Sequence, residues 1–287
     1  MLKNREKPVW KDGCSMPNYF AHLLFGAKML KQLPEEAAAP IRAQREAFNL
    51  GCLGPDPLFF YRPVLPNAAR REGLEMHHES AAPVFARLAR ALGSGIPEAE
   101  GYAAGFLCHF ALDAACHPYV NARAAEGTVA HLAVEAELDR SLMESRGLPA
   151  RGQVYLPPIR EEAVFAAAER AYLWAGAAEV RRGYAAMRRD SLIFARGHGT
   201  RLGVTANRMV ALLPACRSLE GVILPSSYLP ERETFCRALI DILQGESETA
   251  AEKWLEFRRY VRNGGRLSPW FHRDFNGNFK GEEQSPS

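Results

Sequence analysis

Three imidazoles and two carboxylates fall at spacings of four within one stretch of the chain, residues 106–135. His109, Asp113 and His117 form one series, and His131 and Glu135 form a second. In an α-helix, steps of four residues advance by only about 40°, so each series projects from one face. Imidazole nitrogen and carboxylate oxygen are the ligands that zinc and similar divalent metals prefer. The stretch therefore predicts a metal site.

The alternative for each of these residues, taken alone, is structural. A single histidine on an apolar face is usually a packed core residue, and a His–Glu pair four residues apart is usually a surface contact worth a few tenths of a kcal/mol. The neighbours of the first series argue against this alternative, because they include Phe106, Phe110 and several alanines. Ionisable groups in apolar surroundings are costly unless they are paired or metal-bound.

Four residues nearer the N-terminus could join the site. His22 lies in an amphipathic stretch expected to be a helix over 19–32, where a core histidine is the alternative. Asp56 stands between two prolines, which restrict the backbone and could pre-orient its carboxylate, although an ordinary Pro-Asp turn is also possible. His77 and His78 stand at the mouth of another helix, and periodicity does not decide which of them faces the site.

The elements that must position these residues all have a helical pattern. A helix is expected over 101–116 and should end near His117, because Pro118 opposes its continuation. The next helix is expected to begin near Thr128, a good N-cap, and to run to about Ser145. Runs of β-branched residues typical of strands do not recur, so the sequence predicts an all-α fold.

Further helices and the domain limits follow from apolar spacing and from Gly and Pro. Helices are also expected over 40–50, over a segment ending near 93, and over 159–176, 178–196, 201–214, 231–244 and 248–262. A Gly- and Pro-rich segment near 147–158 indicates a boundary or a long linker. The expected parts are an N-terminal extension (1–16), a helical domain (17–147), a C-terminal helical region (158–265) that could belong to the same compact domain, and a disordered tail (273–287).

Composition narrows the class of protein. The 287 residues, 47% hydrophobic, can build one large domain or two small ones. A net charge of +3, from 36 basic and 33 acidic residues, is too balanced to indicate nucleic-acid binding. No signal segment and no long apolar run is evident, so we expect a cytoplasmic protein. The six cysteines show no CxxC spacing, which favours free thiols.

The order of the candidate residues resembles that of the bacterial zinc-dependent phospholipase C family. The resemblance covers residues 16–145 and rests on the ordered set His22, Asp56, His77 or His78, His109-x3-Asp113, His117 and His131-x3-Glu135. Members of that family are all-helical, are related in fold to the S1/P1 nucleases, and hold a three-zinc cluster at the base of a cleft. The resemblance implies a multi-helix domain of this phospholipase C/P1 nuclease-like type, followed by additional C-terminal helices.

The resemblance also implies a ligand set and two or three zinc ions per chain. One zinc would take Asp56, His77 or His78, His109 and Asp113. Asp113 would bridge to another zinc that also takes His22, and a further zinc would take His117, His131 and Glu135. In that family, the residue that matches Asp56 has been proposed as the general base. The sequence departs from the family in its shorter Asp113–His117 gap and in lacking a mature N-terminal tryptophan, since Trp10 is twelve residues before His22.

We therefore expect a zinc-dependent phosphodiester hydrolase, most similar to phospholipase C, that uses zinc-bound hydroxide with Asp56 as the base. The expected substrate is a phospholipid or another phosphodiester, with transient contact at a membrane surface. Paired arginines in the C-terminal half could meet an anionic surface, and solvated helix faces are the alternative. The competing functions are an S1/P1-type nuclease or other phosphoesterase, and a non-catalytic metal-binding helical protein. The lack of a basic stripe interleaved with aromatic residues counts against the nuclease.

Overall fold

The computed structural model describes residues 19–63, 65–213 and 219–280, and the regular secondary structure of these residues is helical. They contain no β-strand, only an isolated bridge between Arg273 and Phe279. The expectation of an all-α fold is confirmed. The α-helices are α1 (Tyr19–Gln32), α2 (Glu35–Ala43), α3 (Arg45–Gly51), α4 (Ala68–Met76), α5 (Ala82–Gly93), α6 (Ala99–Ala125), α7 (His131–Glu144), α8 (Glu162–Ala168), α9 (Ala177–Gly197), α10 (Arg201–Ala211) and α11 (Arg232–Asn263). The 3₁₀ helices are η1 (Asp56–Phe60), η2 (Glu169–Ala171) and η4 (Pro269–His272).

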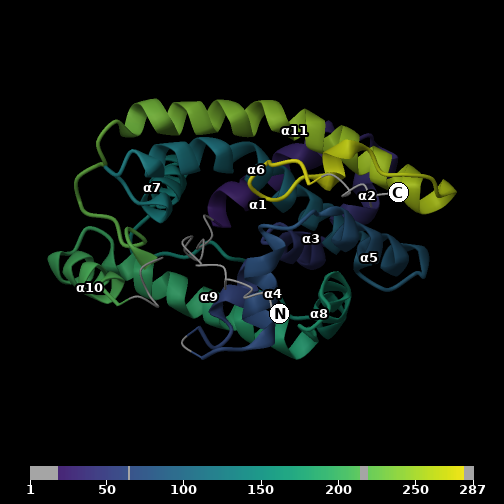
Figure 1. Cartoon of the computed structure of the whole chain (residues 1–287), viewed down its shortest axis with the longest axis horizontal. Coiled ribbons are helices and arrows are strands. Elements are labelled where there is room, and N and C mark those ends of the chain that lie inside the picture. Colours follow the sequence, from purple (N-terminus) through teal and green to yellow (C-terminus); the bar gives the residue numbers. More distant parts are fainter. Residues whose placement is uncertain (1–18, 64, 214–218, 281–287) are drawn as a thin grey trace, which may run out of the picture.

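Helix α6 is the centre of the molecule, and most of its side chains are buried. It packs against α1, α3, α5, α7 and α11, with α11 crossing above it and α9 running below in Figure 1. Small residues allow the close approach of α3 and α6. A Cβ on Gly105 would lie 2.2 Å from the Phe48 carbonyl oxygen, and one on Gly51 would lie 2.2 Å from the Tyr102 carbonyl oxygen. The two backbones therefore touch, which fixes the face of α6 that carries the metal-type side chains.

The prediction that this helix ends near His117 was wrong, because α6 continues through Pro118 to Ala125. Proline has no N–H, so it deprives the Ala114 carbonyl of its usual donor four residues later. Gly277 of the C-terminal segment packs closely there, and a Cβ on it would lie 2.5 Å from the Ala114 oxygen. The continuous helix places His117 within a regular face and extends the helix by about two further turns.

Two other helix boundaries differ from the prediction because polar side chains near them form hydrogen bonds with other parts of the chain. Helix α7 begins at His131 and not at Thr128, whose hydroxyl accepts a hydrogen bond from Arg123 (3.0 Å). The expected helix over 40–50 is two helices, α2 and α3, which meet at Gln44. The Gln44 side chain accepts a hydrogen bond from the Gly101 amide at 2.6 Å, which ties this break to the start of α6.

The C-terminal helices also differ from the prediction in their limits. The segments 231–244 and 248–262 form one helix, α11, because the polar residues between them continue the helical turn. Ser247 is buried within it and donates its hydroxyl to the Gln244 carbonyl (2.9 Å). The expected helix over 159–176 is shorter, comprising α8 and η2.

The C-terminal half packs directly on the first half. One cluster of buried apolar side chains contains residues from both sides of the 147–158 segment. The ring of Phe257 in α11, for example, lies 5.6 Å from that of Phe85 in α5. Helix α9 packs on η1 so tightly that a Cβ on Gly183 would lie 2.2 Å from the Pro57 oxygen. The metal-type residues of the first half are therefore enclosed partly by the second.

The prediction of a disordered tail was wrong for residues 273–280. Phe275 is fully buried and packs 5.2 Å from the ring of Phe110. Residues 281–287 and the predicted extension 1–16, with Trp10, lie outside the described residues.

The described cysteines are Cys52, Cys108, Cys116 and Cys236, all of which are buried free thiols. Cys14 and Cys216 lie outside the described ranges. In the part of the chain that the structure describes, no helix has the length and hydropathy needed to cross a bilayer.

Candidate metal centre

Three groups of histidine and acidic side chains lie at the centre of the fold. Within each group the possible ligand atoms are all within 4.8 Å of one another. The groups are His22, His109 and Asp113; Asp56, His77 and His109; and His117, His131 and Glu135. All of these residues are buried except His131, whose side chain is 27% exposed. Residues separated by more than a hundred positions in the sequence thus meet in one place.

The Asp113 carboxylate is the hub of this arrangement. Its Oδ1 lies 3.2 Å from His22 Nε2 and 3.7 Å from His117 Nε2. Its Oδ2 lies 3.2 Å from His109 Nε2 and 3.7 Å from His77 Nε2. One carboxylate that faces four imidazoles with both of its oxygens can bridge two cations.

The helices bring these side chains together from five places. Helix α6 supplies His109, Asp113 and His117, and α7 supplies His131 and Glu135. The remaining three come from α1 (His22), the first residue of η1 (Asp56) and the residue that caps the C-terminus of α4 (His77). The rings of His22 and His109 stack with their centroids 4.4 Å apart, so α1 and α6 approach each other through the site itself.

For two of the five histidines, hydrogen bonds outside the cluster determine which ring nitrogen faces inward. His77 Nδ1 donates to the Gly73 carbonyl (2.8 Å), and His131 Nδ1 donates to the side-chain oxygen of Asn121 (2.9 Å). In the neutral rings this leaves Nε2 as the atom with a free lone pair. Partners of this kind orient histidines for metal binding.

Several buried atoms of the cluster lack hydrogen-bond partners among the described residues. They include Asp56 Oδ1, His77 Nε2, His109 Nε2 and Glu135 Oε2, and also Nδ1 of His22, His109 and His117. Leaving a buried polar atom unpaired costs about 1–3 kcal/mol, and more for a charged group. Bound cations would satisfy the first four of these atoms together, and the mixture of imidazole and carboxylate is a zinc-type donor set. The imidazole and carboxylate side chains of the cluster therefore fit the zinc-type metal site that their spacing in the sequence predicts.

The buried carboxylates and imidazoles of the cluster shift one another's pKa values. Burial opposes ionisation of Glu135, but His131 and His117 lower its pKa to about 2. Burial would lower the pKa of His117, but Asp113 and Glu135 raise it to about 9. The pKa of Asp113 is held well below its usual value, against the effect of burial, by His109, His117 and His22. Without metal, the carboxylates are thus ionised and hold protons on neighbouring rings, so a cation would compete with those protons.

His77 and His78 are placed differently. His77 is buried within the cluster, whereas His78 is exposed and lies outside the three groups found in the described chain. Phe59, which follows Asp56 closely in the sequence, is buried with its ring 5.2 Å from that of His77. It packs against the cluster as part of the core.

Three residues that support the site were not predicted. Asp139 accepts hydrogen bonds from the amides of Phe20 (3.0 Å) and Ala21 (2.8 Å), and so ties α7 to the start of α1 beside His22. Burial raises the pKa of Asp139 to about 7, while these two amides oppose the shift. Asn121 holds the His131 ring, and Asn276 bonds Asn121 in turn (3.0 Å).

A sequence signal existed for two of these supporting residues. Asn121 continues the spacing of four beyond His117, and Asp139 continues it beyond Glu135. Asn276 carries no local signal, because only the folded chain brings it to the site.

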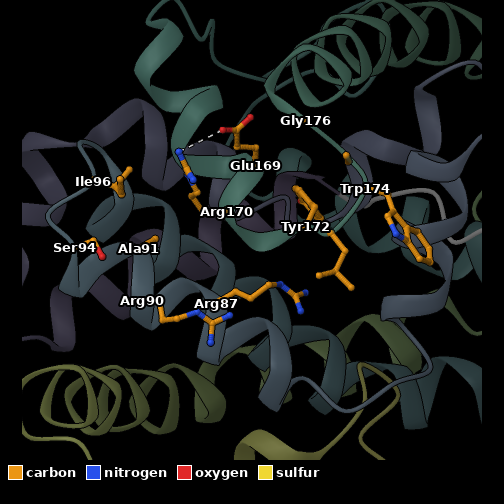
Figure 2. A pocket seen from close by; sticks show the side chains of 12 residues that line it. Arg87, Arg90, Ala91, Ser94, Ile96, Glu169, Arg170, Tyr172, Trp174 and Gly176 are labelled. Atoms are coloured by element: carbon orange, nitrogen blue, oxygen red, sulfur yellow. Dashed lines mark ion pairs between the residues drawn. The ribbon is translucent and has the colours of Figure 1, made fainter.

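A cavity of about 530 Å³ lies apart from the cluster, between α5 and residues 169–176 (Figure 2). Arg87, Arg90 and Arg170 are among the residues that line it. Arg87 donates to the Ala171 carbonyl through Nε (2.9 Å) and Nη2 (2.7 Å), and Arg170 pairs with Glu169 (3.6 Å). None of the described site residues lines this cavity, so it is separate from the candidate metal centre.

Comparison with known protein families agrees with this geometry. The family model of zinc dependent phospholipase C matches residues 21–184, which is more than half of the 287 residues. No curated protein and no solved structure matches the chain significantly. The matched segment contains every residue of the three groups, whereas α10, α11 and the C-terminal segment follow it. The chain belongs to the zinc-dependent phospholipase C family.

Proposed function

We propose that the protein is a zinc-dependent phosphodiesterase that acts on phospholipids in the manner of a phospholipase C. The observation that carries this proposal is the convergence of three groups of imidazoles and carboxylates, buried except for His131, in which several inward atoms lack hydrogen-bond partners among the described residues. Membership of the family supports a phospholipid as the substrate.

The proposed ligands follow the three groups. Asp56, His77, His109 and Asp113 would hold one zinc, Asp113 and His22 a second, and His117, His131 and Glu135 a third. His77 is preferred to His78 because its ring is buried with Nε2 facing Asp56 (3.6 Å) and Asp113 (3.7 Å). Asp113 is the proposed bridge, since its two oxygens face different histidines.

Zinc bound by these residues would supply Lewis acidity and would lower the pKa of a coordinated water toward neutrality. Asp56 is also the proposed general base. Its Oδ1, which lies 3.6 Å from His77 Nε2 and 3.8 Å from His109 Nε2, would bind the zinc, and its second oxygen, Oδ2, would act as the base. It would take the proton of the water that attacks phosphorus. The bond from phosphorus to the glycerol oxygen would break, and the proton taken by Asp56 would pass to that oxygen, releasing diacylglycerol and the phosphorylated head group. The partly exposed His131 marks the side from which substrate would enter.

The neighbouring histidines allow a matched test of the ligand set. We expect His77→Ala, His109→Ala and Glu135→Ala to lower the zinc content of the purified protein and to abolish hydrolysis of a short-chain phosphatidylcholine. His78→Ala should retain both, because His78 is exposed. Zinc is counted by atomic emission, and hydrolysis by release of phosphocholine. Native zinc content in all three core variants would reject the assignment.

The same assay separates the competing functions. Single-stranded DNA, nucleotides and an aryl phosphodiester are offered beside the phospholipid at equal zinc loading. Faster cleavage of the nucleic acid would favour an S1/P1-type nuclease. Full zinc loading without hydrolysis of any of these substrates would favour a non-catalytic metal-binding protein.

A further inference from the structure

Helix α10 and the turn after it present large apolar side chains to solvent. Leu202 is 82% exposed, Met209 66% and Leu213 57%. At 100° per residue Leu202 and Met209 lie about 20° apart on the helix surface, and Leu213 follows the end of the helix at Ala211. The side of α10 that faces the protein carries the small or polar residues Asn207 and Ala211, which are buried. This distribution is the reverse of that in an ordinary surface helix.

The orientation of α10 is fixed by polar contacts on its inner side. Asn207 donates to the Leu219 carbonyl (2.7 Å) and accepts from the Gly221 amide (3.1 Å). At its start, Thr200 caps the helix by accepting from the Gly203 amide (3.0 Å). Rotating the apolar side inward would break both hydrogen bonds of Asn207 and remove the partner of the Leu219 carbonyl and of the Gly221 amide. The outward apolar side is therefore a built feature of the fold.

The surroundings of this apolar side are basic. Between residues 188 and 213 the chain has five arginines and one acidic residue, Asp190. Asp190 is already paired with Arg189 (2.7 Å). Arg201 and Arg208 lie on α10 itself, beside the exposed apolar side chains, and α10 contains no acidic residue. An apolar face flanked by arginines is the pattern of a helix that lies in the interface of an anionic membrane.

We propose that α10 and Leu212–Leu213 form a docking surface for a bilayer that contains anionic phospholipids. The charge of the surface favours this occupant over a second copy of the chain. A two-fold contact through α10 would bring the arginines of one copy against those of the other. An anionic bilayer instead offers negative head groups to Arg201 and Arg208 and an apolar layer to the exposed side chains. Docking requires no hydrolysis, so it goes beyond the proposed function.

The docking surface is connected to helix α7 of the candidate metal centre through Gly221. The Gly221 that bonds Asn207 packs on α7, where a Cβ on it would lie 2.5 Å from the Ala133 side chain. Helix α10 lies at the same end of the molecule as α7 (Figure 1). A bilayer held by α10 would therefore lie at the end of the molecule that contains α7, the helix that supplies His131 and Glu135.

The test measures binding of the full-length, chelator-treated protein to vesicles, so that hydrolysis plays no part. Vesicles of phosphatidylcholine with 30% phosphatidylglycerol are compared with pure phosphatidylcholine by co-sedimentation at low salt and at 0.5 M salt. We expect binding to the anionic vesicles, weakened by salt. Leu202→Glu and Met209→Glu should each weaken binding at least tenfold, and Arg201→Gln with Arg208→Gln should also weaken it.

Leu173→Glu is the matched control, because Leu173 is as exposed as Met209 (66%) but lines the separate cavity of Figure 2. It should bind as the unaltered protein does. The proposal is overturned if the unaltered protein does not bind anionic vesicles, or if Met209→Glu binds equally well. It is also overturned if light scattering shows a dimer that Met209→Glu dissociates. Zinc-loaded Met209→Glu should still hydrolyse a monomeric short-chain phospholipid, which separates failure of docking from failure of the proposed hydrolase.

Discussion

Asn276 donates its side-chain amide to the main-chain carbonyl of His77, 199 positions away in the sequence, at 3.1 Å. The same side chain accepts a hydrogen bond from Asn121 Nδ2 (3.0 Å), and Asn121 Oδ1 accepts one from the ring of His131 (2.9 Å). One residue of the C-terminal segment thus connects the backbone at one proposed ligand with the ring of another. Since such outer partners orient metal ligands, we expect the C-terminal segment to contribute to the proposed metal centre.

The first prediction concerns this connection. Asn276→Ala should weaken zinc binding by about tenfold or more, because the loss of an outer partner typically has an effect of this size. Competition with a chromophoric zinc chelator measures the affinity. Asn278→Ala is the control, since Asn278 lies in the same segment but bonds Asp274 (3.2 Å). Equal zinc affinity of the two variants would contradict the role given to Asn276.

The second prediction concerns the contact between the C-terminal segment and Pro118. Gly277 has φ +78°, and a Cβ on it would lie 2.5 Å from the Ala114 oxygen and 3.2 Å from Pro118 Cγ. Gly277→Ala should therefore lower the free energy of unfolding by about 2–4 kcal/mol, about 1 from the positive φ and the rest from steric overlap. Urea unfolding of the zinc-free protein measures the loss.

Gly152 provides the control for that substitution. Its φ is +74°, and a Cβ there would meet no described atom within 4 Å. Gly152→Ala should thus show only the backbone effect, about 1 kcal/mol. If both alanine variants lost the same free energy, the close packing of Gly277 on α6 would have no energetic consequence.

The third prediction is a proton released on zinc binding. Asp113 and Glu135 outweigh burial and raise the pKa of His117 to about 9, so this ring is protonated in the zinc-free protein at neutral pH. Zinc must displace that proton to use the ring as a ligand, whereas Glu135, with a pKa of about 2, is already ionised. Zinc affinity should therefore rise by about tenfold per pH unit as the pH approaches 9 from below, for one displaced proton.

Isothermal titration calorimetry measures the release of this proton on zinc binding directly. Zinc titrations at pH 7.5 in buffers of different ionisation enthalpy should show a released proton in the unaltered protein. In His117→Ala that proton should be absent. Zinc binding to the unaltered protein without proton release would show that His117 is not a ligand or is not protonated beforehand.

The features predicted from sequence are those encoded within a single helix. Helix α1 has the predicted limits, 19–32, because its apolar spacing is uninterrupted. The spacing of four placed His109, Asp113 and His117 on one face of α6 because that relation depends only on helical geometry. Local periodicity was therefore sufficient both for the all-α class and for recognising candidate metal ligands.

The features that the sequence could not predict depend on contacts between distant segments. The continuation of α6 through Pro118 occurs where Gly277 packs on the helix. The difference between His77 and His78 depends on which ring the fold buries, and the hydrogen bond from His77 to Gly73 then sets its tautomer. Asn276 was missed for the same reason, because nothing near it in the sequence relates it to His77.

The fourth prediction concerns acid stability away from the metal centre. His198, at the end of α9, accepts a hydrogen bond from the Leu224 amide through Nδ1 (3.0 Å). Burial, aided by the charge of Arg140, lowers its pKa to about 4. An unfolded histidine binds its proton near pH 6.5, so between pH 6.5 and 4 the unfolded state carries more protons. Stability should therefore fall as the pH drops through this range, by at most about 3 kcal/mol from this residue.

Urea unfolding of the zinc-free protein at pH 7 and pH 5 tests the effect of His198. His198→Asn keeps an acceptor for the Leu224 amide but cannot be protonated, so its stability should fall less between the two pH values than that of the unaltered protein. His272→Asn, which removes a histidine elsewhere in the C-terminal half, should leave the unaltered pH dependence in place. If His198→Asn lost as much stability on acidification as the unaltered protein, another group would have to account for the acid sensitivity. The comparison uses zinc-free protein because the pH dependence of zinc binding at His117 would otherwise overlap the same range.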